Sequence, residues 1–184
     1  MRIVAGRWRG RRFRFPAADI RPTPDRVRET LFNWLQPRIV GARCLDLYAG
    51  SGALGLEALS RGAASVAFVE NQRLVAEALR ALLHEWQATG AQVTCAEARH
   101  WLGQGVSRTE RFDLVFLDPP YAASRDGELS VVLALLRQGL LASDARIYVE
   151  HAKADPEPPL AGFRQLRTGT AGEVRYHLLG ESDS

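Results

Sequence analysis

The fold of this 184-residue chain is decided by residues 44–57, which read Cys44-Leu45-Asp46-Leu47-Tyr48-Ala49-Gly50-Ser51-Gly52-Ala53-Leu54-Gly55-Leu56-Glu57. A short apolar run with one acid inside it leads into a glycine-containing turn, and apolar residues at helical spacing follow. This order predicts a buried strand, a tight turn and a helix N-terminus, a geometry that lets the backbone approach a ligand closely. Gly50, Gly52 and Gly55 also match the dinucleotide-binding pattern, which by itself is a weak signal.

Strand and helix patterns alternate along the rest of the chain. Apolar runs predict strands over residues 43–48, 65–70, 91–95, 112–118 and 145–150, and helical spacing predicts helices over 53–61, 72–87, 97–103 and 128–140. Two alternating runs, 163–168 and 173–179, predict an antiparallel hairpin at the sheet edge. The predicted fold class is therefore α/β: a Rossmann-like, seven-stranded, mostly parallel sheet with helices on both faces and an antiparallel C-terminal hairpin.

A further helix is expected before the first strand. Thr23 can cap it, Pro24 can occupy its first position, and Pro37 is expected to end it. In the helix over 72–87, apolar residues recur at spacings of three and four, and we assign them to the core: Leu74, Val75, Ala78, Leu79, Leu82, Leu83 and Trp86.

The overall composition indicates one cytoplasmic domain with a full hydrophobic core. No apolar run approaches the roughly 18–20 residues that span a bilayer, and the basic N-terminus lacks the apolar stretch of a secretory signal. Cys44 and Cys95 both fall in predicted strands, and we interpret them as reduced core residues and not as a disulfide or a metal site. We expect a monomer without a metal ion and without a membrane partner.

The charge is distributed unevenly along the chain. Residues 1–28 hold nine arginines against two aspartates, a net charge of +7, whereas the remainder holds fifteen basic and nineteen acidic residues, a net charge of −4. Residues 2–6 and 11–15 predict a β-hairpin arm in which Phe13 and Phe15 alternate with arginine. Such an arm attracts polyanions such as a phosphate backbone; the plainer alternative is a solvated tail whose arginines serve solubility.

Acidic residues follow the predicted parallel strands. Ligands of an open α/β sheet bind beyond the carboxyl ends of the strands, so the glycine turn, Glu70, Glu97 and Asp118 should meet in one crevice. Glu70 follows Gly50 by 20 residues, the spacing at which a carboxylate accepts ribose hydroxyls. Glu97 either accepts a hydrogen of an adenine amino group or caps the helix over 97–103.

The acids near the turn bear on the choice of cofactor. A nicotinamide dinucleotide would place a pyrophosphate at the helix N-terminus, close to Asp46 and Glu57, where two carboxylates would repel it. A sulfonium cofactor with a methionine-like tail and an adenosine fits these residues better.

The tetrapeptide Asp118-Pro119-Pro120-Tyr121 ends the fourth predicted strand. Two prolines hold the chain extended and remove two N–H donors, so carbonyl oxygens and the Asp118 carboxylate can project into the crevice. Acceptors of this kind suit an exocyclic amino group on a nucleobase: by holding its hydrogens, they free the nitrogen lone pair for attack on a methyl sulfonium. Tyr121 offers a ring on which a base can stack. A rigid turn with a capping acid is the structural alternative.

With these motifs, the chain resembles the bacterial RsmD family, S-adenosylmethionine-dependent guanine-N2 methyltransferases of small-subunit (16S) ribosomal RNA. The resemblance covers nearly the whole chain and rests on residues 2–10, 21–23, 28–29, 31–35, 45–63 and 118–121. The chain departs from the family pattern at Glu97, where members of the family commonly have an aspartate, and mildly at Tyr48, where they have a phenylalanine.

The resemblance implies transfer of one methyl group to a guanine of ribosomal RNA, in an assembled or assembling 30S subunit, with S-adenosylhomocysteine as the second product. It implies a basic arm for RNA contact over residues 1–20, a methyltransferase domain over 21–180 and a frayed tail over 181–184. Asp118, Pro119, Pro120 and Tyr121 would be catalytic, with Tyr121 stacked on a flipped base. The expected cofactor-binding residues are Thr23, Asp46, Tyr48, Ala49, Gly50, Ser51, Gly52, Glu70, Asn71, Glu97 and Ala98, and the expected RNA-binding residues are Arg2, Arg7, Arg9, Arg11 and Arg12.

Two other functions are compatible with the same motifs. An acid-Pro-Pro-aromatic motif can hold any exocyclic amine, so a DNA adenine-N6 methyltransferase is one alternative, although the chain has no room for a second large domain that would recognise duplex sequence. A non-enzymatic RNA-binding assembly factor that retains the fold is the other.

Overall fold

A single seven-stranded mixed sheet organises the protein, seen here in a computed structural model that describes residues 1–15, 24–104, 111–120, 127–157 and 162–182. The strand order is β3-β2-β1-β4-β5-β7-β6. Strands β1 to β5 are parallel to one another, and β7 is antiparallel to both β5 and β6. The strands are β1 (Arg43–Asp46), β2 (Ser65–Glu70), β3 (Ala91–Cys95), β4 (Phe112–Leu117), β5 (Leu141–Ala152), β6 (Phe163–Ala171) and β7 (Val174–Glu181). The predicted mixed sheet and edge hairpin are confirmed.

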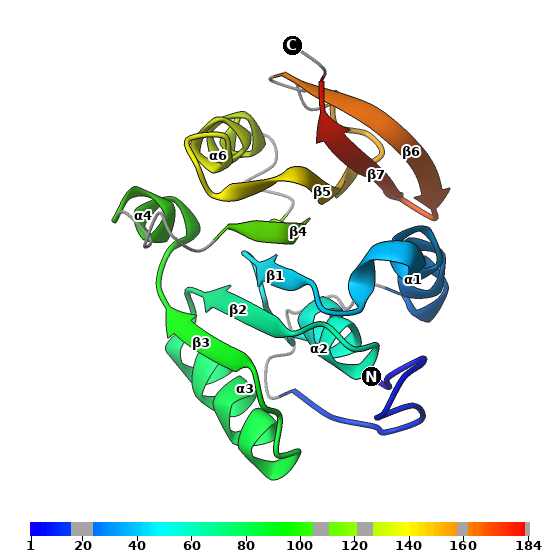
Figure 1. The fold of residues 1–184 in the computed structure, drawn as a ribbon, viewed down its shortest axis with the longest axis vertical. Coiled ribbons are helices and arrows are strands. Elements are labelled where there is room, and N and C mark those ends of the chain that lie inside the picture. The colour runs from blue at the N-terminus through cyan, green and yellow to red at the C-terminus, as the bar shows by residue number, and fades with distance from the viewer. Residues whose placement is uncertain (16–23, 105–110, 121–126, 158–161, 183–184) are drawn as a thin grey trace.

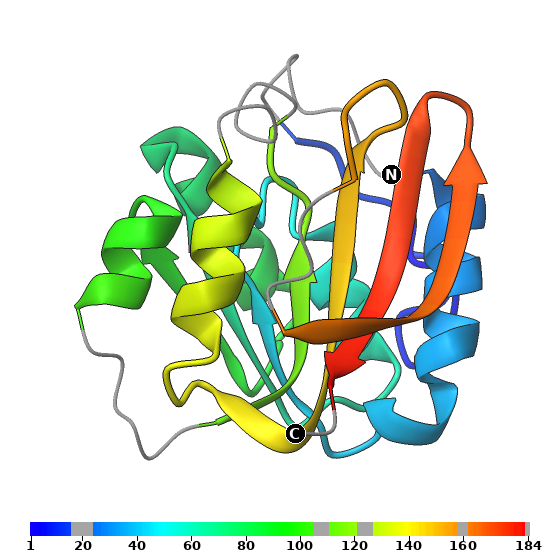
Figure 2. The same cartoon turned by 90° about the horizontal axis from the view of Figure 1, so that it is seen from above.

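The helices cover both faces of this sheet. They are α1 (Asp25–Ile39), α2 (Ala53–Ser60), α3 (Arg73–Glu85), α4 (Ala98–Gly103) and α6 (Glu128–Leu136). Side chains of α1, α2 and α3 share one core cluster with residues of the sheet, and those of α4 and α6 share a second cluster on the opposite face. Figure 1 shows the layers end-on, and Figure 2 shows α6 and α1 on opposite sides of the sheet. No helix in the described part of the chain is long and apolar enough to cross a membrane.

Several sequence expectations were wrong at the ends of elements. Pro37 lies inside α1, which continues to Ile39, and Ile39 is 3% exposed in the core. Burial of Ile39 outweighs the one backbone hydrogen bond that a proline removes. Pro24 is the N-cap residue and not the first helical residue, and Thr23 lies outside the described residues. Glu181, expected in a frayed tail, is the last residue of β7 and pairs with Phe163.

Two expected core residues, Cys95 and Leu74, lie at the surface. Cys95 is a free, exposed cysteine, whereas Cys44 is free and buried as predicted. Cys95 belongs to β3, which is one of the two edge strands of the sheet and is therefore covered less completely than the central strands. Leu74, in the first turn of α3, is 76% exposed, whereas Val75 and Ala76 of the same turn are buried, so Leu74 lies on the face of the helix that points away from the sheet.

Residues 1–15 form a docked segment, here called the N-terminal ribbon. Arg2 and Arg12 form an antiparallel bridge, and backbone hydrogen bonds join Ile3 to Arg11 and Gly10. The apolar side chains Ile3, Trp8 and Phe13 are buried in the same cluster as α1 and α2. The ribbon lies beside α2 (Figure 1), so its backbone is part of the folded core while its arginines face outward.

A buried carboxylate attaches the ribbon to α2. Glu57 is 0% exposed, and it accepts hydrogen bonds from the backbone N–H groups of Val4 (2.8 Å) and Ala5 (2.9 Å). Its third partner is Arg61, whose Nε lies 2.9 Å from the same carboxylate. Ser60 adds a bond to the Ala5 carbonyl at 2.6 Å and accepts one from the Trp8 N–H at 3.0 Å.

The attachment predicts an unequal effect of two glutamate substitutions. Glu57→Ala leaves two backbone donors and a guanidinium without their acceptor, so we expect a loss of about 3–5 kcal/mol in the free energy of unfolding. Glu77→Ala is the matched control, because Glu77 makes the equivalent one-turn pair with Arg73 on the exposed face of α3 and should change stability little. Urea denaturation of both variants measures the difference, and equal effects would contradict the assigned role of Glu57.

Candidate active site

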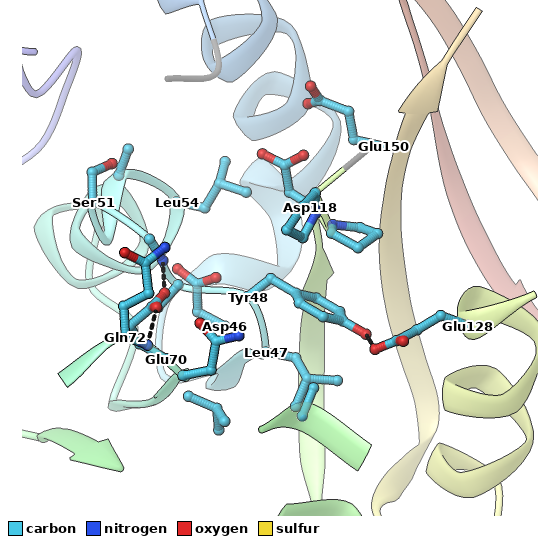
Figure 3. A pocket seen from close by; sticks show the side chains of 18 of the residues that line it. Asp46, Leu47, Tyr48, Ser51, Leu54, Glu70, Gln72, Asp118, Glu128 and Glu150 are labelled. Carbon is cyan, nitrogen blue, oxygen red and sulfur yellow. Dashed lines mark hydrogen bonds between the residues drawn. The ribbon is translucent and has the colours of Figure 1, made fainter. Parts of the chain in front are cut away.

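A cavity with a volume of about 550 Å³ lies beyond the carboxyl ends of β1, β2, β4 and β5. The direction in which successive strands are added to the sheet reverses there, because β1 has β2 on one side and β4 on the other. Figure 3 shows carboxylates from different elements directed into this space. Among the lining residues are Pro24, Asp46, Tyr48, Ala49, Gly50, Ser51, Glu70, Asn71, Gln72, Glu97, Ala98, Asp118, Pro119, Pro120, Glu128, Glu150, Ala171 and Val174.

The glycine turn forms one wall. Gly50 and Gly52 have φ values of +50° and +72°, in the left-handed region that favours glycine. A Cβ on Gly52 would also come within 2.7 Å of the Leu79 side chain, so α3 packs directly against the turn. Gly52 is the N-cap residue of α2, and a bond of 2.6 Å from its N–H to the Ala49 carbonyl closes the turn. Gly52, although part of the predicted set, shapes the turn without lining the cavity.

Glu70 braces this turn from the end of β2. One carboxylate oxygen accepts the N–H of Gly50 at 2.8 Å, and the other accepts the N–H of Gln72 at 2.7 Å. The side chain is 7% exposed. Each oxygen keeps a second lone pair, so the same carboxylate can also accept hydroxyl hydrogens from a ligand in the cavity. The expected position of Glu70 is therefore observed, with a structural role added to it.

Asp46 is buried below the glycine turn. Burial raises the pKa of its carboxyl to about 7; the N–H of Gly55, 3.0 Å away, opposes this change, and the nearby Glu70 adds to it. Gly55 lies in the first turn of α2, where backbone N–H groups have no partner within the helix. Through this bond to Gly55, Asp46 helps to position the start of α2 at the edge of the cavity.

Glu97 and Tyr48 make contacts that the sequence left open. Glu97 is the N-cap residue of α4, and its carboxylate accepts the N–H groups of Arg99 (3.3 Å) and His100 (2.9 Å). It lines the cavity as well, so the capping role is observed and a ligand contact remains compatible with it. The Tyr48 hydroxyl donates to Glu128 at 2.7 Å, and burial together with this bond raises the pKa of Tyr48. Asn71 and Ala98 also line the cavity, as expected.

The proline-rich motif forms the opposite wall. Asp118 is half-buried, Pro119 is buried and Pro120 is exposed, and all three line the cavity. They continue from β4, which pairs with both β1 and β5. Tyr121, like Thr23, lies outside the described residues. The structure thus brings Asp118 and the glycine turn to one cavity from distant parts of the chain.

Sequence reasoning missed two carboxylates of this cavity, Glu128 and Glu150. Glu150 lies near the end of β5, is 5% exposed and accepts a hydrogen bond of 2.7 Å from Tyr148. The rule that acids at strand ends face the crevice was applied to four strands, and its extension to the fifth would have found Glu150. Glu128 begins α6, and its contact with Tyr48 depends on how that helix packs, for which the sequence carries no signal.

The cavity lining is strongly acidic. Six carboxylates belong to it: Asp46, Glu70, Glu97, Asp118, Glu128 and Glu150. Of the described residues that line it, none is lysine, arginine or histidine. A pyrophosphate would meet six acids and no basic side chain among these lining residues, whereas a cationic ligand with ribose hydroxyls finds the acceptors it needs. This lining disfavours the nicotinamide dinucleotide and fits a sulfonium cofactor. Among the described residues, no cluster of three or more His, Cys, Asp or Glu has a geometry that could hold a metal.

The strand order, the glycine turn and the acidic cavity define the fold of S-adenosylmethionine-dependent methyltransferases. Comparison with known proteins narrows this class. The chain belongs to the family described as Conserved hypothetical protein 95, which matches residues 1–180, and this confirms the RsmD resemblance.

Named relatives of the chain are similar over nearly its full length. It is 44% identical to the Escherichia coli K12 protein named Ribosomal RNA small subunit methyltransferase D, over 100% of this chain and 94% of the relative. It is 41% identical to the Haemophilus influenzae protein of the same name, over 97% and 92% of the two chains. The solved structure of yhhF from Escherichia coli superimposes with a TM-score of 0.86 at 43% identity, covering 98% of this chain and 97% of that one.

The raised pKa of Asp46 predicts a pH-dependent stability. Between about pH 4 and pH 7 the folded protein holds a proton that the unfolded chain has lost, so raising the pH across this window reduces stability. The amide introduced by Asp46→Asn cannot titrate, although its oxygen can still accept the Gly55 N–H. In urea denaturation, the stability of the wild type relative to Asp46→Asn should therefore fall from pH 4 to pH 7, by up to about 4 kcal/mol.

Asp113→Asn serves as the control for this measurement. Against the effect of burial, hydrogen bonds from Arg43 hold the pKa of Asp113 below its usual value, so this group stays ionised above pH 5. Its substitution should shift stability equally at pH 5 and pH 7. If the stability of the wild type relative to Asp46→Asn is also constant across this pH range, Asp46 is ionised throughout it in the folded protein.

Proposed function

We propose that the protein transfers a methyl group from S-adenosylmethionine to the exocyclic N2 of a guanine in small-subunit (16S) ribosomal RNA, acting as a monomer on the 30S subunit or its precursor. The observation that carries this proposal is the position of Asp118-Pro119-Pro120 on the wall of an acidic cavity, opposite the glycine turn. Family membership supports it, since relatives of this chain are named small-subunit ribosomal RNA methyltransferases.

The cofactor would be held at the glycine-turn end of the cavity. Gly50 and Ser51 allow close approach of the backbone, Glu70 would accept the ribose hydroxyls, and Asn71 with Ala98 would border the adenine. S-adenosylmethionine supplies an electrophilic methyl group on a positively charged sulfur. The surrounding carboxylates would stabilise that charge, and the described residues that line the cavity include no lysine, arginine or histidine to oppose them.

Asp118 and the Pro119 carbonyl would hold the amine that accepts the methyl group. The amine nitrogen of guanine is a weak nucleophile because its lone pair is delocalised into the ring. Two acceptors that bind its hydrogens draw the nitrogen toward a tetrahedral geometry and direct the lone pair at the methyl group. Asp118 directly follows the central strand β4, so its position would be set before the substrate arrives.

The exposed arginines of the N-terminal ribbon are proposed to bind the RNA backbone. Arg2, Arg7, Arg9, Arg11 and Arg12 are all exposed. The guanidinium of Arg7 lies 4.1 Å from the ring centre of Trp8, and that of Arg11 lies 5.1 Å from Trp86. Stacking of this kind limits the orientations of an arginine and leaves its edge available for phosphate.

Substitution of Asp118 tests the chemistry. Asp118→Ala should reduce methyl transfer about 100-fold or more, because one of two acceptors on the amine is lost, while affinity for S-adenosylhomocysteine stays close to that of the wild type. The assay uses small subunits from cells that lack the enzyme, and mass spectrometry maps the methylated nucleotide. Asp144→Ala is the control: Asp144 lies near the amino end of β5, away from the cavity, and this variant should retain full activity.

Three outcomes would contradict the proposed function. A product at adenine N6, or methylation of naked DNA, would assign the protein to the DNA adenine-N6 class. Full cellular function of Asp118→Ala would indicate an assembly factor that performs no methyl transfer.

Charge substitutions test the ribbon better than its removal. Deleting residues 1–15 would take Ile3, Trp8 and Phe13 out of the core and leave Glu57 without two of its partners. Arg9→Ala combined with Arg12→Ala keeps these interactions. The double variant should bind small-subunit RNA more weakly and reduce the slope of log K against log salt by roughly 0.7–0.9 for each phosphate that the protein no longer neutralises.

The control for this pair is Arg38→Ala, which removes one positive charge from the end of α1, where Arg38 pairs with Asp144. It should leave both affinity and salt slope unchanged. Affinity for S-adenosylhomocysteine should be the same in all variants, and loss of cofactor binding in the double variant would refute a role confined to RNA.

A further inference from the structure

Two carboxylates stand side by side at one end of the cavity. Strands β4 and β5 are parallel neighbours in which Leu117 pairs with Val149, so the next residues, Asp118 and Glu150, occupy adjacent positions and face the same side of the sheet. Both line the cavity, and Figure 3 shows them next to each other. Two adjacent carboxylates offer hydrogen-bond acceptors side by side, an arrangement that suits a ligand with adjacent hydrogen-bond donors.

Glu150 is buried and is held in place by a hydrogen bond from a buried tyrosine. It is 5% exposed, and the Tyr148 hydroxyl donates to its Oε2 at 2.7 Å. Burial, followed by the nearby Glu150 and Asp118, raises the pKa of Tyr148 well above its ordinary value, so this hydroxyl remains a donor at all working pH values. Tyr148 in turn packs on Tyr176, with ring centres 6.1 Å apart, and Tyr176 packs on Trp34 of α1. A carboxylate can accept several hydrogen bonds, so the bond from Tyr148 leaves capacity for a ligand.

The other acids of the cavity have different positions. Asp46, Glu70 and Glu97 all accept backbone N–H groups close to the glycine turn and α4, and Glu128 accepts the hydroxyl of Tyr48. Of these six acids, Glu150 alone occupies the position next to Asp118 in strand register.

The edge of guanine presents two adjacent donors. Its N1–H lies beside the N2 amino group, whereas adenine offers one amino group beside a bare N1 acceptor. If one carboxylate holds the amine, a second carboxylate next to it is attractive to N1–H and repulsive to a bare N1 lone pair. A pair of carboxylates therefore selects guanine over purines that lack N1–H.

We infer that Glu150 accepts the N1–H of the target guanine while Asp118 holds the N2 amine, so that Glu150 determines the base specificity of the enzyme. This inference rests on the proposed function and adds the residue that selects the base. Tyr148 is a positioning residue, which acts through Glu150.

The test compares two target bases in wild-type and Glu150→Gln enzymes. Small subunits are reconstituted with ribosomal RNA that carries either guanine or 2,6-diaminopurine at the mapped position; the second base keeps the N2 amine but has a bare N1. The wild type should prefer guanine by about 10- to 100-fold in kcat/KM. In Glu150→Gln the side-chain amide can donate to a bare N1, so this preference should fall at least 10-fold or reverse.

Two further variants make the result specific. Tyr148→Phe removes only the hydroxyl that orients Glu150, and it should reduce the preference for guanine by a smaller factor than Glu150→Gln does. Glu85→Gln is the control for the same chemical change, since Glu85 is exposed on α3, and it should keep the wild-type preference. Affinity for S-adenosylhomocysteine, measured by calorimetry, should be unchanged in every variant.

The outcomes separate this inference from the proposed function. If the wild type methylates guanine N2 and Glu150→Gln keeps the wild-type preference, the role of Glu150 is refuted and the function stands. A parallel loss of S-adenosylhomocysteine affinity in Glu150→Gln would also refute it, because Glu150 would then belong to the cofactor end of the cavity. If the wild type methylates no guanine, both the function and the inference fail.

Discussion

The reversal of winding between β1 and β4 is the constraint on which the site depends. The chain passes from β1 through β2 to β3 on one side, and then returns to continue from β4 to β5 on the other. The helices of the two halves cover opposite faces, so the loops after β1 and β4 diverge and leave a crevice between them. Parallel strands bring their carboxyl ends to the same edge of the sheet, and for this reason Asp46, Glu70, Asp118 and Glu150 share one cavity.

Six carboxylates in one cavity carry an electrostatic cost, and backbone N–H groups offset part of it. Asp46, Glu70 and Glu97 each accept backbone donors, so their carboxyl groups also hold the glycine turn and the starts of α2 and α4. Burial, to which the nearby Glu70 adds, raises the pKa of Asp46 and so favours the neutral form of this acid where no positive charge is close. A cationic cofactor would supply the missing charge. The cavity thus has a proposed cofactor end, braced by backbone donors, and a proposed base end, where Asp118 and Glu150 lie together.

The N-terminal ribbon connects a charged surface to this site. Its apolar residues enter the core, and Glu57 of α2 binds its backbone, whereas its arginines remain at the surface. The helix that carries Glu57 begins at the glycine turn, so the ribbon and the proposed cofactor site are attached to one rigid element. The proposed RNA contact therefore has a fixed orientation relative to the cavity, which a free basic tail would lack.

Much of the fold could be predicted from the sequence, because hydrophobic periodicity, glycine turns and strand-end acids are local signals. They determined the strand and helix order, the C-terminal hairpin, the convergence of Gly50, Glu70 and Asp118, and the choice between a sulfonium cofactor and a dinucleotide. Tertiary structure alone decided the docking of residues 1–15, the exposure of Cys95, the continuation of α1 past Pro37, and the placement of Glu150 beside Asp118 (Figure 3). These features depend on contacts between segments distant in sequence, where burial and packing outweigh local preference, and no local pattern records which distant partner a side chain will meet.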